Sequence, residues 1–154
     1  MMDYKNAPSN CVLTIERIFD APVDLVWEAW TQPEHIANWW APGPMTLDIK
    51  TFDFEVNGNW EYSMMMDNGN EFIAKGTYLE INPKNLIVTT ASFLPMTAGV
   101  ILVAEFKASG DTTEFVFKVV HPTPEYAKQQ LDMGAMNGWG GVFEGLSKYL
   151  IQIA

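Results

Sequence analysis

The spacing of hydrophobic and polar positions changes along the chain. Residues 11–19 are rich in β-branched and apolar side chains, which predicts a strand. The spacing then becomes that of one helix face, with large side chains at Val23, Val26, Trp27 and Trp30. A second short helix is expected near Pro33, because proline suits the first turn of a helix.

From residue 45 to residue 121 the alternation has a period of two, which predicts β-strands. The connections are rich in Asn, Asp and Gly and are short enough to join antiparallel neighbours. Six strands are expected, over residues 45–54, 59–66, 71–81, 85–93, 99–108 and 112–121. One continuous helix is expected from about Pro124 to Ile151. This order is typical of an α+β fold with helices on one face of an antiparallel sheet.

The last predicted helix carries an apolar face and, nearly opposite, a glycine face made of Gly134, Gly138, Gly141 and Gly145. Each glycine in a helix interior costs roughly 0.8–1 kcal/mol relative to Ala, so tertiary packing must hold this segment helical. Two interpretations stay open. The glycines either accommodate a closely approaching neighbouring chain, or leave a mobile helix that gates a cavity.

Composition indicates one domain over residues 1–154, with an ordered core over about residues 11–151. The net charge of −10 argues against nucleic acid and anionic membranes as partners, and no apolar run suggests membrane insertion. The single Cys11 excludes an internal disulfide and fits a cytoplasmic protein. Two distant histidines and one cysteine give no metal site, and no cofactor-binding motif is present.

Nine Met and six Trp residues in so small a domain favour an apolar cavity, although any one of them can also serve as ordinary core. Strand alternation and the apolar helix face together predict a ligand-binding set: Trp60, Tyr62, Met64, Phe72, Phe117, His121, Met136, Trp139 and Phe143. His121 would supply a polar contact or a general acid–base group. No catalytic motif accompanies it, so no catalytic residue is assigned.

Three stretches resemble one family: "RIFDAPVDLVWEAWTQPEHIANWWAP", "GTYLEINPKNLIVT" and "NGWGGVFEGLSKYL". They are similar to bacterial homologues of the activator of the heat-shock-protein-90 ATPase, within the START-like (SRPBCC) superfamily. The resemblance implies a helix-grip (START-like, Bet v 1-like) fold. In that fold a curved seven-stranded antiparallel sheet surrounds a long C-terminal helix, with two short helices after the first strand. "NGN" at residues 57–59 stands where the family usually has paired glycines, which puts this turn in question.

The resemblance implies a binding protein for a small, largely apolar or aromatic ligand, lipids included, in a cavity between sheet and C-terminal helix. One alternative is a co-chaperone or regulatory module; an exposed Trp39–Trp40 pair would mark its interface. Another is a cyclase or dehydratase that uses His121 and a nearby carboxylate. A homodimer is the commonest assembly for such a chain.

Overall fold

The computed structural model describes residues 4–40, 46–65, 69, 71–94 and 97–153. Its strands form one seven-stranded antiparallel sheet in the order β1-β7-β6-β5-β4-β3-β2. The strands are β1 (Val12–Phe19), β2 (Thr46–Phe52), β3 (Asn59–Met65), β4 (Glu71–Asn82), β5 (Leu86–Leu94), β6 (Thr97–Ser109) and β7 (Thr112–Val120). This confirms the predicted α+β fold. Met45 and Met66, expected at the ends of two strands, lie outside the described residues.

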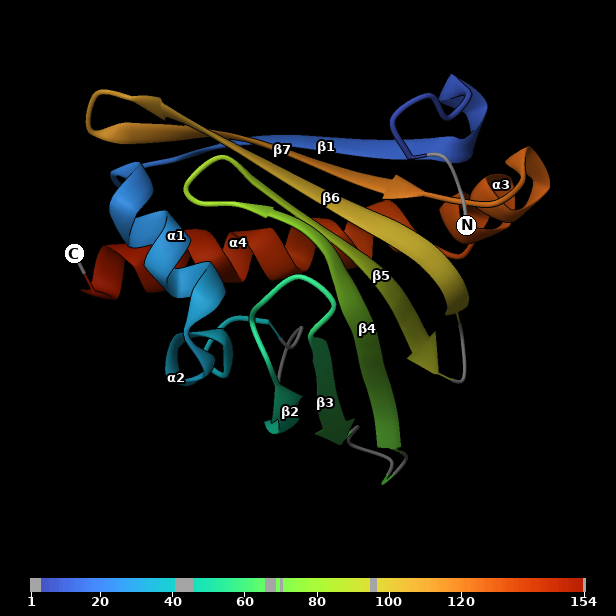
Figure 1. Ribbon diagram of the computed structural model, residues 1–154, viewed down its shortest axis with the longest axis horizontal. Helices are drawn as coiled ribbons and strands as arrows, with labels where there is room; N and C mark the ends of the chain where they lie inside the picture. Colours follow the sequence, from blue (N-terminus) through green and yellow to red (C-terminus); the bar gives the residue numbers. More distant parts are fainter. Residues whose placement is uncertain (1–3, 41–45, 66–68, 70, 95–96, 154) are drawn as a thin grey trace.

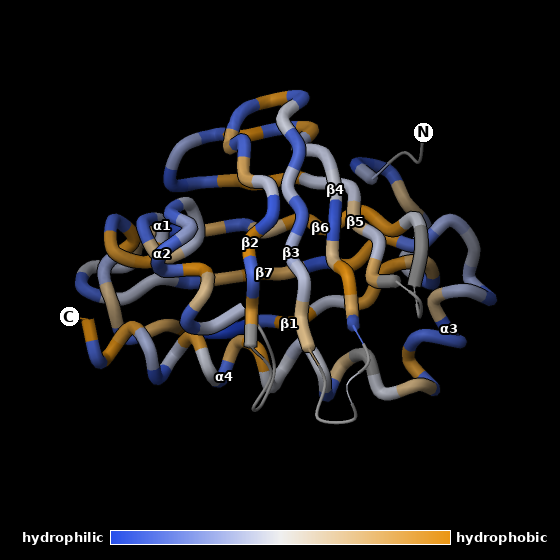
Figure 2. Tube along the Cα trace, turned by 90° about the horizontal axis from the view of Figure 1, so that it is seen from below, coloured by the Kyte–Doolittle hydropathy of each residue, from blue (hydrophilic) through white to orange (hydrophobic). Residues whose placement is uncertain are grey.

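The helices lie on the concave side and at the ends of the sheet. They are the 3₁₀ turn η1 (Ser9–Cys11), α1 (Val23–Thr31), α2 (Pro33–Ile36), α3 (Pro124–Asp132) and α4 (Ala135–Ile153). Figure 1 shows the sheet curving around α4, with α1 and α2 near one end of α4 and α3 near the other. Figure 2 shows α4 crossing beneath the strands. Within the described chain, no helix combines the length and apolar character needed to span a membrane.

Alternate strand residues bury the concave face against α4. On β7, Phe117 pairs with Ile15 of β1 and Ala104 of β6, and all three are buried. The Phe117 ring lies 4.9 Å from that of Phe143 on α4. The convex face carries a second apolar cluster, covered by the N-terminal segment: Tyr4 and Ala7 pack there against Val88, Ile101, Val103 and Val120.

The prediction of one continuous C-terminal helix is wrong. The chain breaks between α3 and α4 at Gly134, whose φ of +88° is a conformation that other L-residues rarely adopt. The Gly134 amide donates to the Leu131 carbonyl (3.1 Å), and its own carbonyl accepts from the Gly138 amide (3.0 Å). Gly134 therefore ends one helix and begins the next.

The predicted glycine face does not receive a neighbouring chain along its length. A Cβ added at Gly138 or Gly141 would meet nothing within 4 Å, and both residues are exposed. At Gly145 an added Cβ would lie 3.8 Å from the Trp39 carbonyl oxygen, an ordinary contact. Close packing therefore does not explain Gly138 and Gly141, and the alternative of a helix that bends easily remains.

The turn before β3 is formed without paired glycines. Asn57 takes a φ of 70°, and asparagine is among the few residues that adopt the left-handed region readily. Gly58 follows, where a Cβ would come within 2.1 Å of the Asp53 carbonyl oxygen. Asn57 thus supplies the positive φ, and Gly58 supplies the close approach.

Two substitutions should separate these roles of glycine. Gly134→Ala should destabilise the protein by about 1–2 kcal/mol, because alanine is strained in the left-handed region. Gly141→Ala should stabilise it by roughly 0.8–1 kcal/mol, because the helix gains propensity and the methyl group meets nothing. Urea unfolding of both variants measures the two changes. A neutral Gly134→Ala variant would contradict the assigned break.

Candidate functional site

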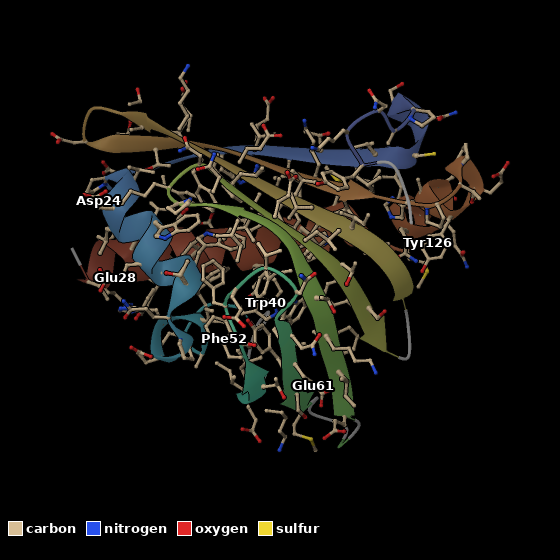
Figure 3. All side chains as sticks on the ribbon, in the orientation of Figure 1. Asp24, Glu28, Trp40, Phe52, Glu61 and Tyr126 are labelled. Carbon is tan, nitrogen blue, oxygen red and sulfur yellow. The ribbon has the colours of Figure 1, made fainter. Side chains whose placement is uncertain are left out.

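A small apolar cavity of about 30 Å³, lined by buried residues, lies between the concave face of the sheet and the segment that contains α1, α2 and the Trp39–Trp40 pair. Figure 3 shows Trp40 in the middle of the molecule. Among the described residues of α4, none lines the cavity. The lining residues are Trp30, Ile36, Trp39, Trp40, Trp60, Tyr62, Tyr78, Ile87, Thr89, Leu102, Ala104 and Phe117.

Four tryptophans in ring contact make up much of this wall. Centroids lie 4.8 Å apart for Trp30–Trp39, 5.6 Å for Trp39–Trp40 and 6.0 Å for Trp40–Trp60. The Trp39 Nε1 donates to the Ala29 carbonyl at 2.9 Å, which holds the segment after α2 against α1. Trp39 and Trp40 are only 2% and 8% exposed, so this pair is internal packing and not an exposed interface.

The polar groups of the cavity wall are neutral. Trp60 Nε1 donates to Thr89 Oγ1 at 2.7 Å. The Tyr62 and Tyr78 hydroxyls share a hydrogen bond, and burial raises the pKa of both phenols above the ordinary value. None of the lining residues is an acid, a lysine, an arginine or a histidine. The wall therefore suits an uncharged guest.

Of the predicted ligand-binding residues, Trp60, Tyr62 and Phe117 line the cavity. Met64 is buried beyond Tyr62 on β3, and Phe143 is fully buried against Phe117. The other members on the concave side, Phe72, Met136 and Trp139, are half-buried around the core.

Trp139 connects the cavity wall with the half-buried aromatic residues outside it. Its ring lies 5.9 Å from Trp40 and 4.7 Å from Phe117, both in the cavity wall. On its other side it lies 5.5 Å from Phe93, which stacks on Phe72. A half-buried aromatic group therefore continues outward from the cavity.

His121 lies elsewhere. It follows β7, four residues beyond Phe117, or about 13 Å along a strand. Its Nδ1 contacts the Cys11 carbonyl oxygen at 3.0 Å, and its ring lies 5.5 Å from Tyr126, which Figure 3 shows well apart from Trp40. Burial lowers the pKa of His121. The structure does not bring it to the cavity.

Most of the wall was not assigned from sequence. Ile87 and Thr89 alternate on β5, as Leu102 and Ala104 do on β6, so strand alternation could have included them. Trp30 belonged to a helical apolar stripe that reads as ordinary core. Nothing local in the sequence indicated that it faces a cavity.

Sequence analysis also missed a polar contact between helices. His35 Nδ1 of α2 lies 2.5 Å from the Tyr149 hydroxyl of α4, and its Nε2 lies 3.7 Å from Glu28 of α1. This contact joins the three helices beside the cavity segment. Among the described residues, no group of three or more His, Cys, Asp or Glu side chains could hold a metal ion.

The model of the family "Activator of Hsp90 ATPase homolog 1-like protein" matches residues 20–151. The chain belongs to this family. No curated protein matches the sequence.

Solved structures similar to this member of the family agree with its fold. A protein from Nitrosomonas europaea is 27% identical, with a TM-score of 0.84 over 94% of this chain and 97% of that one. A Mycobacterium smegmatis protein is 19% identical, with a TM-score of 0.85 over 99% of both chains. A Rhodobacter sphaeroides protein is 15% identical, with a TM-score of 0.86 over 97% and 98%. At these last two identities the likeness shows the fold alone.

His121 should make stability depend on pH. Because its folded pKa is lowered from 6.5, the unfolded chain binds more protons below that pH. Its contribution is therefore complete above 6.5 and is lost as the pH falls toward the folded pKa. His121→Asn keeps an N–H near Nδ1 but does not titrate. Urea midpoints at about pH 7.5 and about pH 5 should differ less in this variant than in the wild type; an unchanged difference would contradict the assignment.

Proposed function

We propose that this protein binds a small, largely apolar ligand between the concave face of the sheet and the helices that cover it. The observation that supports the proposal is the buried cavity, whose wall consists of aromatic and aliphatic residues with a few neutral polar atoms. Ligand sites in proteins have this composition. The family fold commonly binds hydrophobic ligands, which agrees with the proposal.

The size of the cavity determines how a ligand would enter. Its volume is about 30 Å³, whereas a cavity on the order of 150 Å³ binds benzene. A cavity of this size costs only about 0.7 kcal/mol at 24 cal/mol per Å³, so the fold tolerates it without a ligand. A ring-sized ligand would need the wall to move.

Trp139 and the helix around it are the parts best suited to move. Trp139 is half-buried and separates the cavity wall from the outer rings of Phe93 and Phe72. Gly138 and Gly140 flank it, and glycine weakens a helix locally. In this proposal the ligand displaces the Trp139 ring. It then occupies the cavity together with the space that the ring leaves beside Phe93 and Phe72.

A thermal-shift screen tests the proposal, with fatty acids, sterols, flavonoids, polyketides and small aromatic compounds as the panel. A ligand at a hundred times its dissociation constant adds about 2.7 kcal/mol, or roughly 5–10 °C for a chain of this size. The expected result is a rise in the unfolding temperature with one class of compound and not with the others. A flat response across the panel would contradict a ligand-binding role.

A filling variant then locates the site. Ala104 lines the cavity on β6, and Ala104→Val adds two carbon atoms there. The ligand-induced shift should be lost in this variant. Ala108→Val, at an exposed position of the same strand, is the matched control and should keep the shift. Unchanged binding in a folded Ala104→Val variant would place the ligand elsewhere.

A further inference from the structure

Trp30 occupies an unusual position for a tryptophan. It lies on α1, is only 8% exposed and forms part of the cavity wall. Its ring packs against Trp39 at 4.8 Å, Phe117 at 6.4 Å and Phe143 at 6.1 Å. These neighbours are aromatic hydrocarbon or indole rings, so they offer its N–H no strong acceptor.

The Trp30 N–H has no hydrogen-bond acceptor among the protein atoms that the structure describes. In the described part of the chain, its Nε1 is the one buried side-chain nitrogen or oxygen with no partner. Two other buried indoles of the wall differ, because Trp39 Nε1 donates to a carbonyl and Trp60 Nε1 donates to Thr89. A buried unpaired donor costs about 1–3 kcal/mol and is rare in native proteins. An acceptor that enters the cavity would recover that cost.

The rest of the wall restricts the chemistry of that acceptor. One of the Tyr62 and Tyr78 hydroxyls donates in the hydrogen bond between them, and the other keeps its O–H proton as a second donor, since a hydroxyl carries one donor and two acceptor sites. Both phenols line the cavity and are buried. None of the described residues that line it is cationic, so a carboxylate would enter without a counter-charge from them, at a high desolvation cost.

We propose that the ligand is a neutral, largely apolar molecule that carries a carbonyl oxygen, and that this oxygen accepts a hydrogen bond from Trp30 Nε1. The inference rests on the proposed function, since it names the chemical class of ligand for the same cavity. Trp30 acts as the polar recognition residue, and the surrounding rings supply the apolar contact.

Three probes of nearly equal size separate the contributions of the carbonyl acceptor, of apolar contact and of charge to binding. Acetophenone carries a neutral carbonyl, ethylbenzene has the same shape without an acceptor, and benzoate carries the acceptor with a negative charge. Each is titrated into the ¹⁵N-labelled protein, and the indole N–H resonances are followed by NMR. We expect acetophenone to bind roughly tenfold more tightly than ethylbenzene, the worth of one hydrogen bond, and to shift the Trp30 resonance most. Benzoate should bind more weakly than acetophenone.

Trp30→Phe removes the donor and keeps an aromatic ring. The preference for acetophenone over ethylbenzene should disappear in this variant, whatever the change in stability. Trp27→Phe, on the same helix and outside the cavity wall, is the matched control and should keep the preference. If Trp30→Phe does not fold, the ranking of the three probes in the wild type decides.

The outcomes separate this inference from the proposed function. Equal binding of acetophenone and ethylbenzene, with the Trp30 resonance unmoved, would overturn the carbonyl acceptor and leave an apolar ligand site. Tighter binding of benzoate than of acetophenone would also overturn the inference that the ligand is neutral. Binding of none of the three would count against the proposed function itself.

Discussion

Helix α4 is held by its contact with the sheet, and the arrangement of the concave side depends on that contact. The ring of Phe143 lies 5.0 Å from Phe115 and 4.9 Å from Phe117, while Leu146 and Leu150 are almost fully buried. Burial of each such side chain contributes about 1.5–3 kcal/mol, against roughly 0.8–1 kcal/mol lost at each interior glycine. Packing therefore outweighs the poor helix propensity of the segment.

The packing of α4 against the sheet also determines where the cavity lies. Phe143 and its neighbours fill the space directly between α4 and β7, so no opening is left there. The opening lies to one side, where the bulky rings of Trp30 and Trp40 meet the strands and do not fill the space completely. The cavity therefore lies nearer α1 and α2 than the predicted position beneath the face that carries Trp139 and Phe143.

Alternation along the chain was sufficient to predict the strands, because each strand buries one face and exposes or half-exposes the other. Trp60, Tyr62 and Phe117 could be placed on the inner face for that reason. The helix break could not be predicted, since Gly134 looks like the other glycines of its stripe until its φ is known. His121 continues the alternation that places Phe117 on the inner face of β7. Its ring nevertheless contacts the Cys11 carbonyl, 110 residues away in sequence, at the end of β7 that lies away from the cavity.

The role of Trp30 could not be predicted for a related reason. Its spacing is that of a core-facing helix residue, and it is indeed buried. Whether its N–H finds a partner depends on the residues around its ring, which come from β6, β7, α4 and the Trp39–Trp40 segment, and no local pattern encodes that outcome. Trp39 shows the contrast, since its N–H meets a carbonyl only ten residues earlier in the chain.

The chain of indoles from Trp30 through Trp39 and Trp40 to Trp60 has an optical consequence. Neighbouring rings at these separations couple their electronic transitions, so light absorbed by one indole migrates to the others. The near-ultraviolet circular dichroism of the four therefore depends on their mutual distances and angles. A displacement of any ring in the cavity wall therefore alters the spectrum of the whole group, and the protein carries its own spectroscopic reporter.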